Sequence, residues 1–266
     1  MTRLTIIGIS FIFCCLMFAG LSFAKLDPKT CIGVWLFDEG TGNVAKDSSG
    51  NQNDGTFVKN PKWVDGKFGK ALEFDGVSSY VDCGKDESLN IKTGGSVTMC
   101  AWVNSNVGST GSWQAIMAKR DGASYSYGIN LITGAFQVYT SGTSGVQGFA
   151  YNLPVNQWVF VCGIMSAKPT ELYINGELFG TNGPGGGVSA IAGNPLTIAE
   201  SFGALGAFGA AEIFNGIIDE VAVFDVVLTA DDIKSIMTKG LGAALGIAAV
   251  SEAGKLTTTW GDIKQQ

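Results

Sequence analysis

The side chains in this chain that can do chemistry are carboxylates, cysteines and aromatic rings. Its 266 residues include 23 Asp and Glu, 17 Lys and Arg, six Cys and no His. Without histidine the chain cannot form a Ser-His-Asp or Cys-His catalytic set, a His-ligated zinc, copper or iron site, or an imidazole pH switch. Oxygen is the ligand atom available in quantity, and calcium is the metal that such ligands favour.

The spacing of the carboxylates predicts a protein that is not an enzyme. Retaining glycosidases need two carboxyl groups about 5 Å apart, and acids two residues apart on a strand share one face. Asp219 and Glu220 are adjacent, so a regular strand directs them to opposite faces, and Glu212 is too far upstream to complete the pattern. Glu171 and Glu177 flank a predicted hairpin without a third acid. We therefore assign no catalytic residue.

The charge balance argues against polyanionic partners. The formal net charge is −6, whereas binding to nucleic acid or heparin needs clustered Lys and Arg. Glycine is frequent, with 38 residues, and only 15% of the residues are charged. This composition is typical of apolar strands joined by many tight turns. We expect no nucleic-acid partner.

Residues 1–24 have the features of an export signal. Arg3 precedes an almost unbroken apolar run, and Ser22-Phe23-Ala24 fits a small-x-small cleavage site. Cleavage after Ala24 predicts a protein that is secreted or held at the cell surface or in the periplasm, with no stable membrane span. An uncleaved anchor is the alternative, since roughly 18 or more apolar residues can cross a bilayer.

The cysteines that remain after such cleavage predict disulfides. Cys14 and Cys15 would leave with the signal. An even number of cysteines in an exported chain, with no CxxC spacing, favours disulfides over metal ligation, and free buried thiols are the alternative. The four remaining cysteines are Cys31, Cys83, Cys100 and Cys162.

The elements that must position these side chains are short strands. They are too closely spaced for helical crossovers, which predicts antiparallel sheets in one domain. The Asn175-Gly176 pair supplies the two positive-φ positions of a type I′ hairpin turn. The alternating stretches are Ile32–Phe37, Lys70–Phe74, Ser79–Asp82, Val97–Val103, Gly128–Ile132, Phe136–Tyr139, Trp158–Ile164, Glu171–Ile174, Leu196–Ile198 and Ile217–Phe224.

The end of the chain changes in character. From Leu228 to Met237 the apolar period lengthens to three and four residues, and Thr229 is a plausible N-cap with Asp232 three residues on. This predicts one short surface helix. Residues 239–266 are predicted to be a tail, either a flexible extension or one that orders on contact, with a docking role as the weaker alternative. Its apolar run of about eleven residues is too short to span a membrane as a helix.

Ten segments, read in order, carry a family resemblance: Ile32–Gly40, Asp47–Gly50, Asn53–Gly55, Lys70–Gly76, Tyr80–Val81, Val97–Val103, Trp158–Val161, Tyr173–Gly176, Asn215–Val221 and Leu228–Thr229. Together they resemble the laminin-G-like jelly-roll family of the concanavalin A-like lectin/glucanase fold. The resemblance covers residues 31–238 and is most specific over 97–230. It implies an all-β, antiparallel two-sheet jelly-roll sandwich with one short C-terminal helix, over a domain of residues 25–238.

The cysteine placement is similar to that of pentraxins within this fold. That similarity implies a disulfide between Cys100 and Cys162, whose loop of about 62 residues would stabilise the protein by ~4 kcal/mol in the chain-entropy model. Cys31 and Cys83 would then form the second pair, in one of the three connectivities that four cysteines allow.

The resemblance also implies one structural calcium ion, because members of the wider fold often hold one where an aspartate on the last strand meets the first strands. Asp219 matches the last-strand position, and Asp38 and Asp75 end segments that would lie near it. The alternative is that Asp38 and Asp75 only form turns, which Asp before Gly commonly does.

Candidate ligand contacts lie in the connections between strands, where a jelly roll usually presents its binding surface. An aromatic platform beside polar groups is the expected signature of a carbohydrate site. The tryptophans on alternating strands are expected in the core instead. The candidate ligand contacts are Trp113, Arg120, Tyr125 and Tyr151.

Together these features predict an exported, non-catalytic recognition or adhesion module. It would bind a glycan or a cell-surface or extracellular protein through loops of the sandwich. The alternative is a structural or self-assembling surface protein that binds no sugar. A polysaccharide-active enzyme on the same fold is less favoured, since lyases of this fold typically use His, Tyr and Arg or Gln, and Arg120 is the one arginine that follows the predicted signal.

Overall fold

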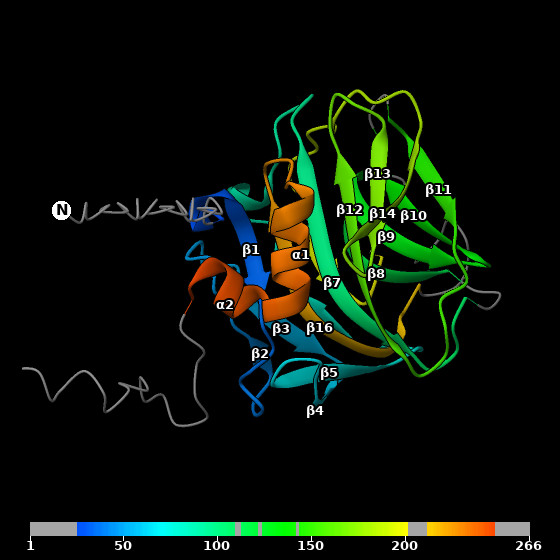
Figure 1. Cartoon of the computed structure of the whole chain (residues 1–266). Helices are drawn as coiled ribbons and strands as arrows, with labels where there is room; N and C mark the ends of the chain where they lie inside the picture. Colours follow the sequence, from blue (N-terminus) through cyan, green and yellow to red (C-terminus); the bar gives the residue numbers. More distant parts are fainter. Residues whose placement is uncertain (1–25, 110–112, 122–123, 142–143, 202–211, 248–266) are drawn as a thin grey trace, which may run out of the picture.

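Period-two alternation of apolar residues builds two stacked antiparallel sheets of eight strands each (Figure 1). A computed structural model describes residues 26–109, 113–121, 124–141, 144–201 and 212–247. The predicted signal peptide and the last part of the predicted tail lie outside these residues. The sandwich architecture confirms the predicted all-β fold.

The first sheet, sheet A, is built around β16, which is ten residues long. β1 pairs with the second half of β16, whereas β5 pairs with its first half on the same side. Sheet A runs β14 (Glu177–Asn182), β13 (Thr170–Ile174), β12 (Trp158–Met165), β7 (Val97–Ser105), β16 (Asn215–Phe224), β5 (Lys70–Asp75) and β4 (Lys62–Asp65), with β1 (Cys31–Trp35) beside β16.

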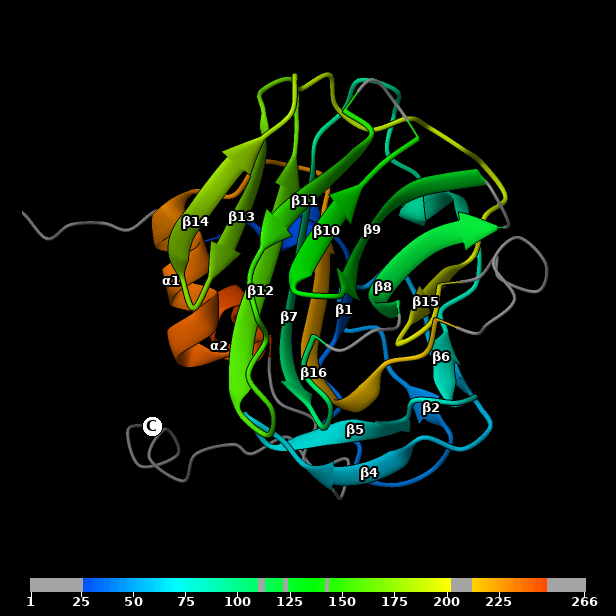
Figure 2. The same ribbon diagram turned by 90° about the vertical axis from the view of Figure 1, so that its right-hand side faces the viewer.

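The second sheet, sheet B, places four long strands at one end, and these face the viewer in Figure 2. Sheet B runs β11 (Val146–Ala150), β10 (Ala135–Tyr139), β9 (Ser124–Ile132), β8 (Gln114–Asp121), β15 (Leu196–Ile198), β6 (Tyr80–Asp82), β3 (Gly55–Val58) and β2 (Val44–Ala45). Two 3-10 turns, Pro28–Thr30 and Glu87–Leu89, complete the elements outside the C-terminal helices.

The main hydrophobic core fills the layer between the two sheets. Trp35, Phe136 and Tyr127 are fully buried there. The Trp35 indole nitrogen donates a 2.9 Å hydrogen bond to the Asn53 carbonyl, which satisfies its one polar atom. The expectation that strand tryptophans serve the core therefore holds for Trp35.

Two short helices cover the outer face of sheet A, namely α1 (Ala230–Lys239) and α2 (Leu241–Leu245). Thr229 and Asp232 form the predicted capping box of α1. In α2, Leu241 and Leu245 are buried in a second apolar cluster between the helices and sheet A. The ordered domain thus extends beyond residue 238, and the region predicted as a tail begins with a packed helix.

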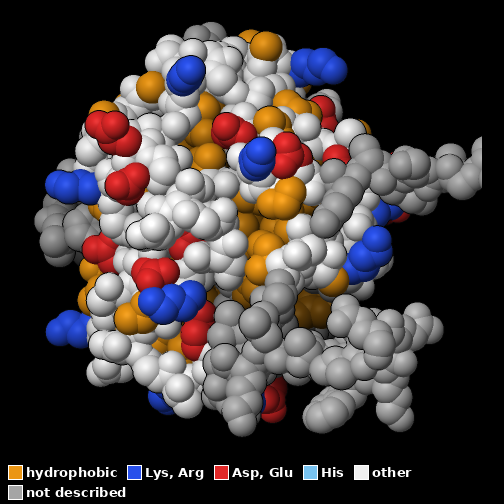
Figure 3. All heavy atoms as spheres, turned by 90° about the vertical axis from the view of Figure 1, so that its left-hand side faces the viewer, with side chains coloured by type: hydrophobic (Ala, Val, Ile, Leu, Met, Phe, Trp, Pro, Cys, Tyr) orange, Lys and Arg blue, Asp and Glu red, His pale blue; other side chains and the backbone are white. Residues whose placement is uncertain are grey.

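The helix side of the molecule faces the viewer in Figure 3, where apolar side chains gather near the centre and charged side chains surround them. None of the described helices is long and apolar enough to cross a membrane. The predicted hairpin turn between β13 and β14 is also present, with φ of 49° at Asn175 and 77° at Gly176.

Candidate functional site

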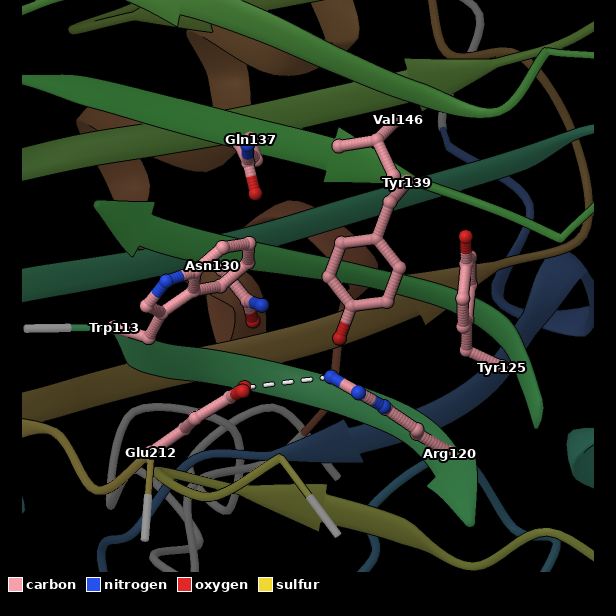
Figure 4. A pocket seen from close by; sticks show the side chains of 8 residues that line it. All are labelled: Trp113, Arg120, Tyr125, Asn130, Gln137, Tyr139, Val146 and Glu212. Carbon is pink, nitrogen blue, oxygen red and sulfur yellow. Dashed lines mark hydrogen bonds and ion pairs between the residues drawn. The ribbon is translucent and has the colours of Figure 1, made fainter. Parts of the chain in front are cut away.

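A pocket of about 180 Å³ opens on the outer face of sheet B, away from the core (Figure 4). We call it the sheet B pocket. Strands β8 to β11 supply most of its walls, and the segment that leads into β16 supplies one acidic side chain. Its lining residues are Trp113, Arg120, Tyr125, Asn130, Gln137, Tyr139, Val146 and Glu212.

Strand alternation places the polar floor of the pocket. On β10, Phe136 and Val138 point into the core, so Gln137 and Tyr139 point outward. Asn130 is the direct cross-strand partner of Gln137 in the β9–β10 register. The two amide side chains therefore share one face and meet in the pocket.

A glycine lets the Tyr139 ring lie across its neighbouring strand. Gly128 is the cross-strand partner of Tyr139. A Cβ at Gly128 would come within 2.4 Å of both Cζ and the hydroxyl oxygen of Tyr139. With no side chain at this position, the phenol reaches over β9 toward Arg120 on β8, as Figure 4 shows.

A β-bulge brings Tyr125 to the pocket. Lys119 pairs with Tyr127, but the next pair is Arg120 with Tyr125, so the register skips Ser126. Tyr127 is buried in the core, and regular alternation would send Tyr125 there too. The skipped residue puts Tyr125 on the outer face instead, where its ring lies 5.7 Å from the Arg120 guanidinium carbon and 5.3 Å from the Tyr139 ring.

The pocket contains a buried ion pair. Arg120 Nη1 lies 3.4 Å from Glu212 Oε2, and the two side chains are only 9% and 5% exposed. Arg120 Nη1 also donates a 2.9 Å hydrogen bond to Ser201 Oγ. Burial raises the pKa of Glu212, and the charge of Arg120 opposes that rise.

Three buried oxygens of the pocket make no hydrogen bond of normal geometry with the described residues, although the Tyr139 hydroxyl also interacts with the Ser201 side chain. They are Asn130 Oδ1, Gln137 Oε1 and the Tyr139 hydroxyl. Burying such groups without a partner costs about 1–3 kcal/mol each. The mouth is apolar, since Trp113 is 47% exposed and Val146 is also exposed. Oxygens without a hydrogen-bond partner, beside aromatic rings, are suited to a ligand with several hydroxyl groups.

Three of the four predicted ligand-contact residues, Trp113, Arg120 and Tyr125, line this pocket. Tyr151 does not. Its ring stacks on Phe136 at 5.7 Å and meets Phe179 edge-on at 5.4 Å, so it extends the core at the far edge of sheet B.

Four lining residues are not among the ligand contacts predicted from the sequence, namely Asn130, Gln137, Tyr139 and Glu212. Asn130 and Gln137 were recognisable in principle, as polar residues at outward positions of strands whose other face is apolar. Glu212 had no such signal, because an irregular segment positions it.

The predicted calcium residues fall in two separate places. Asp38, which follows β1, and Asp219 on β16 meet the loop of residues 66–69, at the junction where β1 and β5 share one side of β16. We call this the carboxylate junction. The amides of Lys67 and Phe68 donate to Asp219 Oδ2 at 2.8 and 2.9 Å. The amide of Lys70 donates to Asp38 Oδ1 at 3.0 Å.

The carboxylate junction is closely packed and holds its acids away from water. Gly69 has a φ of +56°, and a Cβ there would lie 1.9 Å from Asp38 Oδ1. Asp219 is fully buried, and its Oδ1 has no partner among the described residues. Burial, reinforced by the charges of Glu220 and Asp38, raises the pKa of Asp219 to about 8.

A second bulge draws Glu220 to the same junction. Glu220 has a φ of 53°, and the register of β16 shifts between Asp219 and Ala222. Its carboxylate accepts a hydrogen bond from the Leu241 amide of α2. Burial raises the pKa of Glu220 to about 7, and the charge of Asp38 adds to the rise. Asp219 and Glu220 thus both interact with Asp38, although a regular strand would direct these two adjacent acids to opposite faces.

Asp75 lies at the opposite end of β5 from Lys70 and belongs to a turn. Its Oδ1 accepts hydrogen bonds from the amides of Val77, Ser78 and Ser79 at 2.8–2.9 Å. Partial burial opposes the effect, but these bonds lower the pKa of Asp75. The turn-former interpretation therefore describes Asp75, and the three aspartates do not form one site. Within the described ranges, no three acidic or cysteine side chains come together as metal ligands.

The two predicted cysteine pairs also differ, because the structure brings one pair together and keeps the other apart. Cys100 and Cys162 are direct partners on β7 and β12, with their sulfurs 2.9 Å apart, although the structure holds them as thiols. Cys31 lies in the cluster on the helix side of sheet A, whereas Cys83 lies between the two sheets. Sheet A separates these two thiols, so the structure does not bring the predicted Cys31–Cys83 pair together.

The family follows from a sequence profile, Laminin_G_3, described as the concanavalin A-like lectin/glucanases superfamily, which matches residues 75–234. This segment is more than half of the chain, and the chain belongs to that superfamily. A search of curated protein sequences finds no match.

Solved structures with the same fold include domain 4 of AbnA, an extracellular arabinanase from Geobacillus stearothermophilus, in complex with arabinotriose. It has a TM-score of 0.57 and 20% identity, and the match covers 79% of this chain and 98% of that domain. The binding domain of botulinum neurotoxin DC in complex with SialylT gives a TM-score of 0.59 and 15% identity, over 79% of this chain and 51% of that one. The chain thus spans about half the length of that neurotoxin domain.

Proposed function

We propose that this protein is a non-catalytic carbohydrate-binding module and that the sheet B pocket holds the sugar. The observation that carries the proposal is the set of buried, unpartnered oxygens of Asn130, Gln137 and Tyr139 in an aromatic-walled pocket. A sugar offers hydroxyl groups to such atoms and an apolar ring face to aromatic side chains. A sugar would therefore pair oxygens that no other side chain of the pocket satisfies.

Fold similarity supports the proposal by analogy. The arabinanase domain of the same fold was solved with arabinotriose, and the neurotoxin binding domain with SialylT. One fold can host unrelated functions, so the weight rests on the pocket itself.

The number of carboxyl groups that line the pocket supports a non-catalytic role. Glu212 is the one carboxyl among the described lining residues, and it is paired with Arg120. Glycoside hydrolysis commonly uses two carboxyl groups on either side of the scissile bond. Release of reducing sugar from mixed polysaccharides, lost on Glu212→Gln, would overturn this part of the proposal.

A glycan array probed with the purified protein tests the binding itself. We expect selective binding that weakens at least about tenfold, or 1.4 kcal/mol, in Trp113→Ala, because this change removes the exposed ring at the mouth. Leu178→Ala is the matched control, since Leu178 is 50% exposed on β14 and is not a pocket residue. Selective binding that survives Trp113→Ala and Tyr139→Phe would place the ligand elsewhere.

We also propose export of the chain and a disulfide between Cys100 and Cys162. Their facing positions on neighbouring strands support the disulfide. Thiol counting on the unreduced, denatured protein purified after export should find two reactive thiols among the four cysteines that follow the predicted signal. Four would contradict the disulfide.

The structural or self-assembling alternative has one specific observation in its favour. β14 is an edge strand of sheet A, and it exposes Leu178 and Phe179. Exposed apolar edge strands are templates for strand pairing between chains. Size-exclusion chromatography separates the two functions, because self-association lost in Leu178→Lys, without selective glycan binding, would favour the alternative.

A further inference from the structure

In the sheet B pocket the positive charge of Arg120 is already compensated by a neighbouring carboxylate. Arg120 is the one Lys or Arg among the described lining residues, and it is engaged by Glu212, by Ser201 and by the face of the Tyr125 ring. Because this ion pair is buried, an anionic ligand would have to displace Glu212 or lie beside its charge uncompensated, and both are costly. The pocket thus lacks a free cation for an acidic group.

The remaining polar groups of the pocket are uncharged. Asn130 Oδ1, Gln137 Oε1 and the Tyr139 hydroxyl oxygen lack partners, and they lie around the same cavity (Figure 4). A sugar hydroxyl can both donate to and accept from the Tyr139 hydroxyl and the two side-chain amides, whereas a carboxylate, sulfate or phosphate can only accept. An anion would therefore leave Asn130 Oδ1 and Gln137 Oε1 without donors.

The size of the cavity limits how much of a glycan it can hold. At about 180 Å³ it is smaller than the roughly 300–1,000 Å³ of pockets that enclose drug-sized ligands. Trp113 and Val146 are exposed at its mouth, so further sugar units would lie against the mouth and outside the cavity. The cavity fits one ring.

We propose that the sheet B pocket takes one neutral, hydroxyl-rich sugar ring and rejects sugars that carry a carboxylate, sulfate or phosphate. This inference rests on the proposed function, because it specifies the sugar class for the same pocket. Arg120 acts through its pairing with Glu212, which keeps the guanidinium from recruiting an anion. Glu212 is the specificity-determining residue.

The test is a glycan array printed with matched pairs that differ only in charge. Suitable pairs are galactose with galacturonate, glucose with glucuronate, and lactose with sialyllactose or sulfated lactose. We expect the neutral member of a bound pair to bind at least about tenfold more tightly. Equal or tighter binding of acidic members would overturn the inference but leave the proposed function standing. If no member of any pair binds, both fail.

A single variant should abolish the preference for neutral sugars if the inference is correct. Glu212→Gln keeps the shape of the side chain and frees the charge of Arg120. The ratio of neutral to acidic binding should then fall at least about tenfold. Glu177→Gln is the control, since Glu177 is an exposed carboxylate on β14 whose ion pair is with Lys234. An unchanged ratio in a folded Glu212→Gln protein would overturn the inference.

A second variant covers the case in which Glu212→Gln does not fold. Tyr139→Phe removes one acceptor oxygen and keeps the ring over Gly128. It should weaken neutral sugars without any gain in acidic ones. A gain in acidic sugars in this variant would overturn the inference, because it would show that Tyr139, and not the pairing of Glu212 with Arg120, sets the charge preference.

Discussion

The sheet B pocket and the carboxylate junction both bury oxygens without hydrogen-bond partners, yet they are built differently. In the pocket the orphaned oxygens are neutral and lie beside an open mouth with exposed Trp113. At the junction the orphaned oxygen belongs to an acid, Asp219, and the loop of residues 66–69 packs over it. A neutral orphan can be satisfied by a ligand hydroxyl, whereas an acidic orphan is relieved by a proton or a cation.

Because of this difference, we expect the two sites to respond to different changes in solution conditions. The pocket should respond to sugar and hardly to pH, since its orphaned oxygens belong to uncharged groups. The junction should respond to pH and calcium and not to sugar. Three experiments sharpen or break that contrast.

The largest expected effect is the pH dependence of stability in the metal-free protein. The folded protein holds a proton on Asp219 up to about pH 8, whereas the ordinary pKa is 3.8. The folded state therefore binds more protons than the unfolded one between these values, so the free energy of unfolding falls as pH rises from about 4 to about 8. One such group contributes at most about 1.4 kcal/mol per pH unit.

Asp219→Asn should flatten this pH dependence, measured by chemical denaturation from pH 4 to 8 in chelator. Asp75→Asn is the control, because the pKa of Asp75 is lowered and its turn lies at the other end of β5. A slope that persists unchanged in Asp219→Asn would show that the junction acid does not titrate in this range.

The next effect is calcium binding at the junction, which we propose in reduced form. Asp38 and Asp219 are the two predicted ligands that the loop of residues 66–69 brings together, and neutralisation of their charge is what a cation supplies. At a hundredfold excess over its Kd, calcium would add about 2.7 kcal/mol of stability.

Thermal unfolding in calcium and in chelator measures this effect. The midpoint should rise by several degrees in calcium at neutral pH, and the rise should vanish in Asp219→Asn but persist in Asp75→Asn. No shift in the unaltered protein would contradict calcium binding at the junction. Protonation would then be what neutralises the buried acids there.

The smallest effect tests the glycine under Tyr139. Gly128→Ala should reduce sugar binding at least about tenfold, or 1.4 kcal/mol, because its Cβ would displace the Tyr139 ring. Gly148→Ala is the matched control on β11, where a Cβ meets no atom within 4 Å. Equal affinities in the two variants, compared on the glycan identified by the array, would show that the position of Tyr139 does not matter.

Local signals in the sequence predicted the regular parts of the fold. The Asn175-Gly176 turn and the capping box at Thr229 depend on a few neighbouring residues, and both form as expected. The two-sheet sandwich followed from strand spacing together with the family resemblance. The turn and the capping box are decided by local backbone preferences, which a sequence displays directly.

Both sites depend on irregularities that the sequence does not display. Tyr125 and Tyr127 are two residues apart and should share a face, but the register skips Ser126 and separates them. Likewise, the bulge at Glu220 brings two acids to the junction that alternation would send apart. Bulges are set by the fit of neighbouring strands, so tertiary packing decides them.

The first and last described residues lie on the side of the molecule opposite the sheet B pocket. Leu26 and Ile247, the first and last described residues, pack against the cluster beneath α1 and α2. In Figure 1 these helices and β1 lie on one side, and strands β9 to β11 lie on the other. A tag or partner module joined directly before Leu26 or after Ile247 would therefore attach on the side opposite strands β9 to β11. Copies joined in that way would present the sheet B pocket in one common orientation, which favours multivalent capture of a repeating surface.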